Sequence, residues 1–321
     1  TSTDGQALPD VFSQCDFRIL PKSPDQVDPE GRPAYSVGKT RPIIISPSVM
    51  RILAHCMLSV LTPKAIRFIG EDQRGFVPGR IGLDNILALD EFISAQRGRR
   101  GGSQAMVWLI DFANAFSSLS WQYIRKVIRK IGFPPGWCRA IESLLHTQIN
   151  LTFRGTSVKN FVQVLRGFRQ GCPLSGLMFC LCIEPLLARL SAPTIGRALA
   201  FADDIAILKT AVYQADAART VTVFVEFERV SSLKVHVGKT VLIPVWLEDR
   251  NAVDGVRDID RRRFLNTPWP ALPDCVKSRG DYLGLPIGLS VTSDDVFRKP
   301  MAKLVDRIRH YATKGLNFTE K

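Results

Sequence analysis

The sequence predicts an α+β fold with a mixed sheet, because short apolar strands alternate with long segments of helical spacing. Residues 17–22 and 40–45 form two such strands around a loop rich in Pro, Gly and Asp, which predicts a hairpin. Helical spacing then covers residues 48–69, and Asp84 is the expected cap of a second helix that runs to about Gln96. A Gly- and Arg-rich break separates this helix from the next strand.

The rest of the chain continues the alternation. Residues 177–190 have so few polar positions that a helix there must be buried over most of its circumference. Apolar runs on either side of residues 201–204 predict two strands joined by a tight turn. A polar stretch with little pattern extends to about residue 277. The remaining expected elements are a strand ending at Asp111, helices at 120–131, 137–147, 213–231 and 293–312, a hairpin beginning at residue 150, and a strand at 239–244.

Composition narrows the possible partners. The 321 residues carry 43 Lys and Arg against 30 Asp and Glu, a net charge of +13, which favours a polyanion such as nucleic acid. No segment approaches the roughly 18 uninterrupted apolar residues of a membrane span, so we expect no membrane partner. The seven cysteines are scattered through apolar stretches, and the four histidines lie apart from them. This pattern favours a reducing, intracellular compartment over a disulfide framework or a zinc site.

The acidic pair Asp203-Asp204 is the most informative feature of the sequence. A water-facing acidic β-turn is one interpretation, since Asp is common in turns. However, both carboxylates lie between apolar runs, where burial and mutual repulsion are unfavourable unless a cation is present. Asp111 ends another apolar strand, so two strands could present Asp111 and Asp203 side by side. Such an arrangement is typical of a two-metal site.

Five motifs follow one another along the chain. They are Arg41-Pro42-Ile43, the segment QRGFVPGR at residues 73–80, DFANAF at 111–116, RQGCPLS at 169–175 and FADD at 201–204. Together they resemble the reverse transcriptases of non-LTR (LINE-type) retroelements, which are related to group II intron enzymes. The resemblance extends from about residue 17 to residue 321. It implies a right-hand polymerase fold, with fingers at 1–105, palm at 106–290 and only the start of a thumb at 291–321. Residues 120–170 would contribute helices and a hairpin to fingers and palm.

The same resemblance implies the catalytic centre. Asp111 and Asp203 would bind two Mg²⁺ ions, and Asp204 would support them. Nucleotidyl transfer leaves little covalent work to the protein, because one ion activates the primer 3′-hydroxyl and the other neutralises the triphosphate and pyrophosphate. Carboxylate oxygens suit Mg²⁺, and the substrate supplies further ligands.

The resemblance also implies residues that contact the nucleotide. Phe116 matches a steric gate against the ribose 2′-hydroxyl, although an aromatic residue there could equally belong to the core. Arg41 and Lys22 would grip the triphosphate, and Lys22 could instead be a solvated loop residue. Gln170 would pack near the nucleotide. Lys239 would protonate departing pyrophosphate, unless it is an ordinary surface charge.

Template and primer contacts are implied for five further residues. Gly171 would let the backbone approach the templating base closely. Arg169 would contact the template backbone, and Arg80 lies in a segment that would guide the template, although its glycines could serve only a turn. The segment around Tyr282 and Gly284 resembles a hairpin that holds the primer end.

Three positions depart from the family pattern without removing a metal ligand: Ser117 for Asp, Gly176 for Pro and His236 for Asn. The chain ends where thumb helices would begin, which suggests a fragment, a split enzyme completed by another protein chain, or a domesticated remnant. Two functions remain open. One is an RNA-directed DNA polymerase that uses Mg²⁺, dNTPs, an RNA template and a primer. The other is a non-catalytic RNA-binding scaffold in a large ribonucleoprotein such as an organellar ribosome. Either would act in the nucleus or a mitochondrion.

Overall fold

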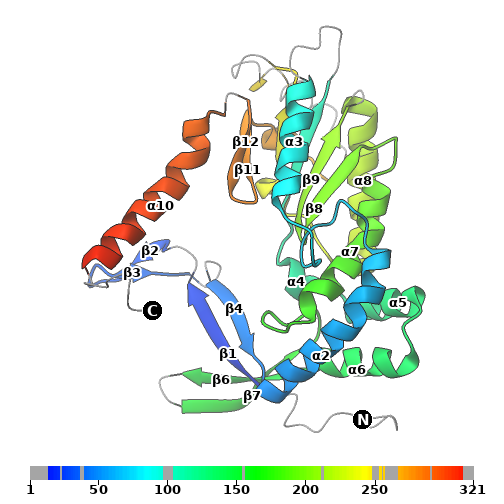
Figure 1. The fold of residues 1–321 in the computed structure, drawn as a ribbon, viewed down its shortest axis with the longest axis vertical. Helices are drawn as coiled ribbons and strands as arrows, with labels where there is room; N and C mark the ends of the chain where they lie inside the picture. The colour runs from blue at the N-terminus through cyan, green and yellow to red at the C-terminus, as the bar shows by residue number, and fades with distance from the viewer. Residues whose placement is uncertain are drawn as a thin grey trace.

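Two four-stranded sheets and the helices around them make up the fold (Figure 1). The computed structural model describes residues 14–21, 24–36, 40–96, 104–153, 156–210, 213–247, 253–254, 256, 267–289 and 291–313. The first sheet has the strand order β4-β1-β6-β7 and the second the order β10-β5-β9-β8.

The first sheet combines two distant parts of the chain. The predicted hairpin is confirmed, because β1 (Gln14–Pro21) pairs antiparallel with β4 (Thr40–Ile45). On its other edge β1 pairs in parallel with β6 (Thr147–Phe153), which forms the second predicted hairpin with β7 (Thr156–Val164). The segment expected to be a loop contains a small ribbon of β2 (Gln26–Val27) and β3 (Pro33–Ala34). Two-residue strands are too short for periodicity to reveal them.

The second sheet is covered on both faces. Its strands are β5 (Met106–Ile110), β8 (Arg197–Phe201), β9 (Asp204–Lys209) and β10 (Val241–Pro244). Side chains alternate between two clusters: one packs on α7 (Ser175–Leu190) and α8 (Tyr213–Ser231), and the other on α3 (Leu83–Gln96). All five residues of β5 are buried, as expected for a strand enclosed on both sides.

The helices follow the predicted order. Helix α7 is buried on nearly all sides, as its composition predicts. Asp84 lies in the first turn of α3 and does not cap it. The further elements are α2 (Ser48–Ala65), η2 (Ile66–Phe68), α4 (Ala115–Ser118), α5 (Trp121–Ile131), α6 (Pro135–Leu145), η3 (Val237–Lys239), η5 (Leu272–Cys275), β11 (Arg279–Tyr282), β12 (Leu285–Gly288) and α10 (Ser293–Thr313).

Helix α2 has an ambiguous composition. With η2 it forms the segment Ser48–Phe68, which is long and apolar enough to cross a membrane by length and composition alone. A helix at the edge of a protein core passes the same test. Met50, Ala54, Met57 and Leu61 are buried at helical spacing and belong to the main core cluster. This row packs one face of α2 on the core. Only 28% of the apolar segment is buried, because Val49, Ile52 and Val60 on other faces are exposed.

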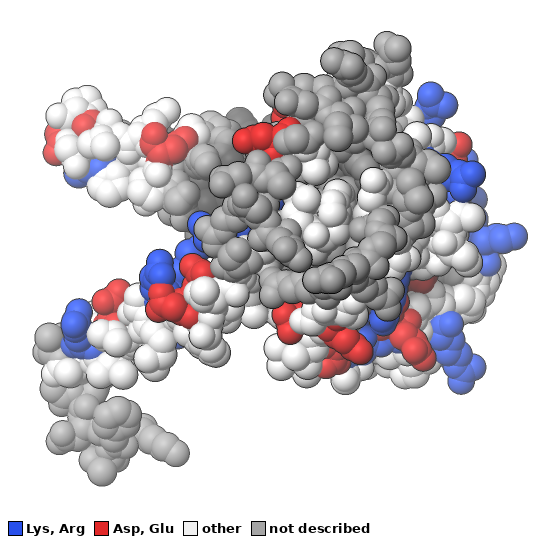
Figure 2. All heavy atoms as spheres, turned by 90° about the horizontal axis from the view of Figure 1, so that it is seen from above, with Lys and Arg blue, Asp and Glu red and all other residues white. Residues whose placement is uncertain are grey.

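Helix α10 stands apart from both sheets (Figure 1). Its residues from 297 to 312 are all exposed, including the large apolar side chains of Phe297, Met301 and Ile308. Viewed from above, two arms project from the body with an open gap between them (Figure 2). In the same view Lys and Arg side chains gather on the edge of the body opposite the arms, where acidic residues are fewer.

Candidate active site

The strand ends of the second sheet bring the acidic residues together. Strand β9 pairs antiparallel with β5, with Ile205 opposite Ile110, and with β8, with Asp204 opposite Phe201. Extending the pairing of β5 and β9 by one residue places Asp111 beside Asp204. Asp203 lies in the tight turn between β8 and β9. Two segments far apart in sequence therefore converge at the end of the sheet where β5 stops and β9 begins.

The three carboxylates influence each other electrostatically. Burial, together with the neighbouring charges of Asp203 and Asp111, raises the pKa of Asp204 to about 6. Burial is also the main cause that raises the pKa of Asp203, with a contribution from Asp111. Like charges are thus held together at a partly buried edge, which is unfavourable without a nearby cation.

One oxygen of Asp111 lacks a hydrogen-bond donor. Its Oδ2 atom is buried and has no hydrogen-bond partner among the described residues. The Nζ atom of Lys239 lies 3.6 Å from this oxygen, too far for a good hydrogen bond but close enough for an ion pair. A buried carboxylate oxygen without a donor is costly, and a bound cation would relieve that cost.

The donor set fits magnesium in a specific way. Within the described part of the chain, no three His, Cys, Asp or Glu side chains form a group that could hold a metal ion unaided. Mg²⁺ typically takes one or two protein carboxylates and completes its shell with water and substrate phosphates. Asp111 and Asp203 offer such a pair of carboxylates, and carboxylate oxygens suit Mg²⁺.

We expect Asp204→Asn to change how stability depends on pH. A carboxyl whose pKa is raised on folding binds its proton more tightly in the folded state, so metal-free wild type loses stability as pH rises from about 4 to about 6. Asparagine cannot ionise, so the variant should keep that stability at neutral pH. Thermal unfolding in EDTA at acidic and neutral pH measures the difference. An equal melting temperature of the two proteins at neutral pH would contradict the prediction.

Phe116 lies between two other aromatic rings. Its ring stacks on Phe179 of α7 with centroids 4.4 Å apart, and the edge-to-face ring of Phe76 is 5.9 Å away. Both arrangements are favourable and restrict the ring. Gly176 makes room for this cluster, because a Cβ atom there would lie 2.4 Å from the Phe76 ring. The departure from Pro at this position therefore has a packing explanation.

The loop at residues 169–171 lies against β4. The Ile44 N–H donates to the carbonyl of Gln170 at 3.2 Å. Gly171 has a φ of +109°, and a Cβ atom there would lie 2.9 Å from the Ile44 carbonyl oxygen, so this position requires glycine. Arg41 belongs to the same strand, but its side chain and all of Lys22 lie outside the described residues. Their predicted grip on the triphosphate stays a prediction.

Two of the residues predicted to contact nucleic acid have buried side chains. Arg169 is only 3% exposed, and its guanidinium donates to the Leu144 carbonyl and to Cys15 Sγ at 3.2 Å. Tyr282 is also 3% exposed, and its hydroxyl accepts from Asn85 at 3.2 Å. Both side chains are enclosed by the protein in this structure, and their roles toward template and primer stay predictions. A motif in the sequence does not show which distant segments enclose its side chains.

Three other residues predicted to contact nucleic acid or nucleotide, Arg80, Gly284 and Lys239, differ in their exposure to solvent. Arg80 donates to the carbonyls of Gln73 at 2.7 Å and Ile69 at 3.2 Å, so its guanidinium organises its own loop. Gly284 lies at the exposed turn between β11 and β12 with a φ of +83° and no atoms crowding it. The Lys239 side chain is 65% exposed beside Asp111. Their roles toward template, primer and pyrophosphate stay predictions.

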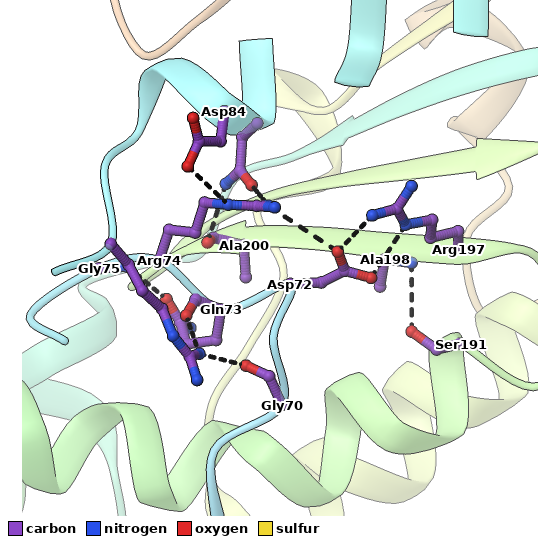
Figure 3. A network of polar contacts seen from close by, with 12 residues as sticks. Gly70, Asp72, Gln73, Arg74, Gly75, Asp84, Ser191, Arg197, Ala198 and Ala200 are labelled. Carbon is purple, nitrogen blue, oxygen red and sulfur yellow. Dashed lines mark hydrogen bonds and ion pairs between the residues drawn. The ribbon is translucent and has the colours of Figure 1, made fainter. Parts of the chain in front are cut away.

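A polar network missed by the sequence analysis lies beside the aspartate turn, and Gln73 is the member that binds it (Figure 3). Gln73 is 1% exposed and hydrogen-bonds the turn, and Asn85 donates to the Ala200 carbonyl of β8 at 2.9 Å. Arg74 links Asn85 to Asp84 and Asp72 through a hydrogen bond and ion pairs. Gln73 and Arg74 lie in the motif at residues 73–80, but the sequence gave no signal for these contacts, because they depend on β8 and on the turn that follows it.

Comparison with known proteins decides the family. The sequence model described as "Reverse transcriptase (RNA-dependent DNA polymerase)" matches residues 21–287, which is most of the chain and includes all three aspartates. The chain belongs to the reverse transcriptase family. The resemblance predicted from the five motifs is thereby confirmed.

Curated relatives place this reverse transcriptase domain among retroelement proteins. It is 28% identical to the Pol polyprotein of the type-1 retrotransposable element R2 of Popillia japonica, over 63% of the chain and 28% of that protein. It is 29% identical to the R2DM Pol polyprotein of Drosophila melanogaster, over 50% of the chain and 16% of that protein. It is 29% identical to the transposon TX1 149 kDa protein of Xenopus laevis, over 52% of the chain and 14% of that protein. The matched region spans less than a third of each relative.

The fold agrees with this assignment. A solved structure of telomerase from Candida albicans, in complex with a fragment of telomeric RNA, superposes with a TM-score of 0.55. The match covers 89% of this chain and 46% of that chain at 10% identity, so it shows the fold alone. The predicted right-hand polymerase fold is confirmed. The relationship to group II intron enzymes and the division into fingers, palm and thumb stay predictions.

Proposed function

We propose that the chain is the catalytic domain of an RNA-directed DNA polymerase that extends a primer on an RNA template with dNTPs. The observation that carries the proposal is the meeting of Asp111, Asp203 and Asp204 at one sheet edge, with raised pKa values for the latter two and a buried Asp111 oxygen that lacks a donor. A purely structural acidic turn would satisfy its carboxylates with backbone N–H groups and would not collect three of them.

In this proposal Asp111 and Asp203 hold two Mg²⁺ ions, and Asp204 adds negative charge beside them. When bound, the ions would stabilise charge on the attacking 3′-hydroxyl oxygen and on the departing pyrophosphate. Lys239 extends into solvent beside Asp111, so its ammonium is positioned to interact with phosphate oxygens and to donate a proton to the leaving group. The immobilised ring of Phe116 provides a flat wall against the nucleotide sugar.

The partners of the proposed enzyme are an RNA template and a primer, together with the rest of a longer polypeptide or another protein chain. A net charge of +13 favours association with polyanions, with affinity that falls as salt rises. The proposed location is intracellular, in the nucleus or a mitochondrion. The scaffold alternative uses the same charge, and no contact at the aspartates favours it over polymerisation.

Primer extension tests the proposal directly. The purified full chain is incubated with an RNA template, an annealed DNA primer and dNTPs, and product length is followed on a gel. We expect extension with Mg²⁺ and none after chelation by EDTA, because the carboxylates alone supply no Lewis acid. The Glu142→Gln variant is a matched control, since this carboxylate pairs with Arg125 and Arg129 on α5, away from the aspartates.

The contradicting result is equally specific. Folded protein that unfolds cooperatively and binds the primer–template duplex, yet adds no nucleotide with Mg²⁺ or Mn²⁺, would overturn the polymerase proposal. Co-purification with a large RNA that is unaffected by Asp111→Ala and Asp203→Ala would then support the scaffold function.

A further inference from the structure

We propose that Gln73 is a positioning residue for the aspartate turn, which it holds by binding both polar backbone groups of Ala202. This inference rests on the proposed polymerase function of the site and adds a residue outside the carboxylates to it. Gln73 comes from the loop between α2 and α3, 129 positions before the residue it binds.

The backbone at Ala202 requires external support. Its φ is +57°, in the left-handed region that L residues other than Asn and Asp seldom adopt. Such conformations persist only where surrounding contacts determine them, and they concentrate at functional sites. Ala202 immediately precedes Asp203, so its dihedral angles set the direction in which the Asp203 side chain projects.

One side-chain amide supplies that support. The Gln73 Oε1 atom accepts from the Ala202 N–H at 2.8 Å and from the Gly75 N–H at 2.9 Å. The Gln73 Nε2 atom donates to the Ala202 carbonyl at 3.3 Å. The side chain is 1% exposed, so water does not compete for these bonds. Three hydrogen bonds to backbone therefore fix both the amide and the residue that carries the unusual φ.

The backbone around Gln73 is anchored to the neighbouring strand. Gln73 forms a parallel bridge with Ala200 of β8, where the Arg74 N–H donates to the Ala200 carbonyl at 2.8 Å and the Ala200 N–H donates to the Asp72 carbonyl at 2.9 Å. Figure 3 shows Asp72, Gln73 and Arg74 beside this strand. At Gly75 a Cβ atom would lie 2.3 Å from the Ala202 nitrogen, so the loop approaches the turn as closely as glycine allows.

If Gln73 only packed its own loop, its two hydrogen bonds to Ala202 would have no explanation. The neighbouring Asp72 secures the same loop through its ion pair with Arg197 at 2.6 Å, and within the described residues its side chain makes no hydrogen bond to the turn. Among the described residues of this network, Gln73 is the one whose side chain hydrogen-bonds to Ala202, the residue before Asp203. The Asp72→Asn variant is therefore a matched control for loosening of the loop without release of the turn.

The test measures the turn and the reaction separately in the full chain. Gln73→Met keeps the length of the side chain and removes its hydrogen bonds. We expect hydrogen exchange of the Ala202 amide to accelerate by about tenfold or more, since that N–H loses its acceptor. We expect kcat for primer extension to fall by about tenfold or more, while KM for dNTP and Kd for primer–template change by less than about threefold. Asp72→Asn should change neither exchange at Ala202 nor kcat.

A second substitution tests the mechanism. Glycine adopts positive φ without strain, so Ala202→Gly should reduce the loss of kcat caused by Gln73→Met, and the two effects should be non-additive. Additive effects, or unchanged kcat despite faster exchange, would overturn the proposal. Equal losses in Asp72→Asn would also overturn it, because they would indicate general loosening.

Failure of the polymerase proposal is recognised separately, from wild type that does not extend a primer. In that case Mn²⁺ binding, followed by electron paramagnetic resonance, replaces kcat as the readout. Weaker Mn²⁺ binding by about threefold or more in Gln73→Met, with faster exchange at Ala202, would support the positioning role. Unchanged binding or unchanged exchange would overturn it.

Discussion

Asp203→Asn is expected to abolish primer extension while leaving the fold intact. The substitution preserves shape but removes one of the two carboxylates proposed to hold the metal ions. We expect a loss of at least about 10³-fold in kcat, because losing one preorganised charge contact at a reacting group already costs about 10²–10³-fold. Single-nucleotide extension under saturating primer–template measures it.

The thermal stability of Asp203→Asn should not fall with its activity. Burial and the charge of Asp111 raise the pKa of Asp203, so its ionised form is disfavoured in the folded protein. Neutralising it should leave the melting temperature of metal-free protein unchanged or higher at neutral pH. Glu142→Gln, on α6, is the control variant and should retain extension. Substantial extension by Asp203→Asn would remove this residue from the catalytic centre.

Phe116→Val is expected to relax selection against ribonucleotides. The ring is held by Phe179 and Phe76, so it cannot easily move away from a 2′-hydroxyl. Replacing it by a shorter side chain opens space, and the ratio of kcat/KM for dNTP over rNTP should fall by about 10- to 100-fold. Competitive incorporation of one dNTP and the matching rNTP measures this ratio.

Phe112→Leu is the matched control. Phe112 lies in the same motif but contacts Phe224, with centroids 6.2 Å apart, on the side facing α8. It should lower thermal stability through lost packing without changing sugar selectivity. If Phe116→Val kept the wild-type ratio, or Phe112→Leu changed it equally, the aromatic cluster would be core packing and not a gate.

The sequence predicted the elements that depend on local pattern. Period and polarity located β5, β8 and β9 and the acids at their ends, because a buried strand tolerates a carboxylate only where it terminates. The helix at residues 213–231 was predicted with its observed bounds. Motif order then predicted the family and the right-hand fold, which the comparisons confirm.

Contacts between distant segments escaped prediction. The resemblance of the motif at residues 169–175 implies that Arg169 contacts the template, yet its guanidinium lies against Cys15, Ser46 and Leu144. Tyr282 was expected at the primer, but Asn85 of α3 binds its hydroxyl inside the protein. The role of Gln73 is invisible locally, since it depends on a turn formed much later in the chain.

The placement of β1 has a consequence for folding during synthesis. Its partners are β4, which follows soon after it, and β6, which emerges from the ribosome only after β5 and helices α2 to α6. Until then one edge of β1 carries unpaired N–H and C=O groups, a condition that invites association between nascent chains. The first sheet therefore closes late and slowly. A chain truncated before residue 147 would keep that edge open permanently and should be prone to aggregation.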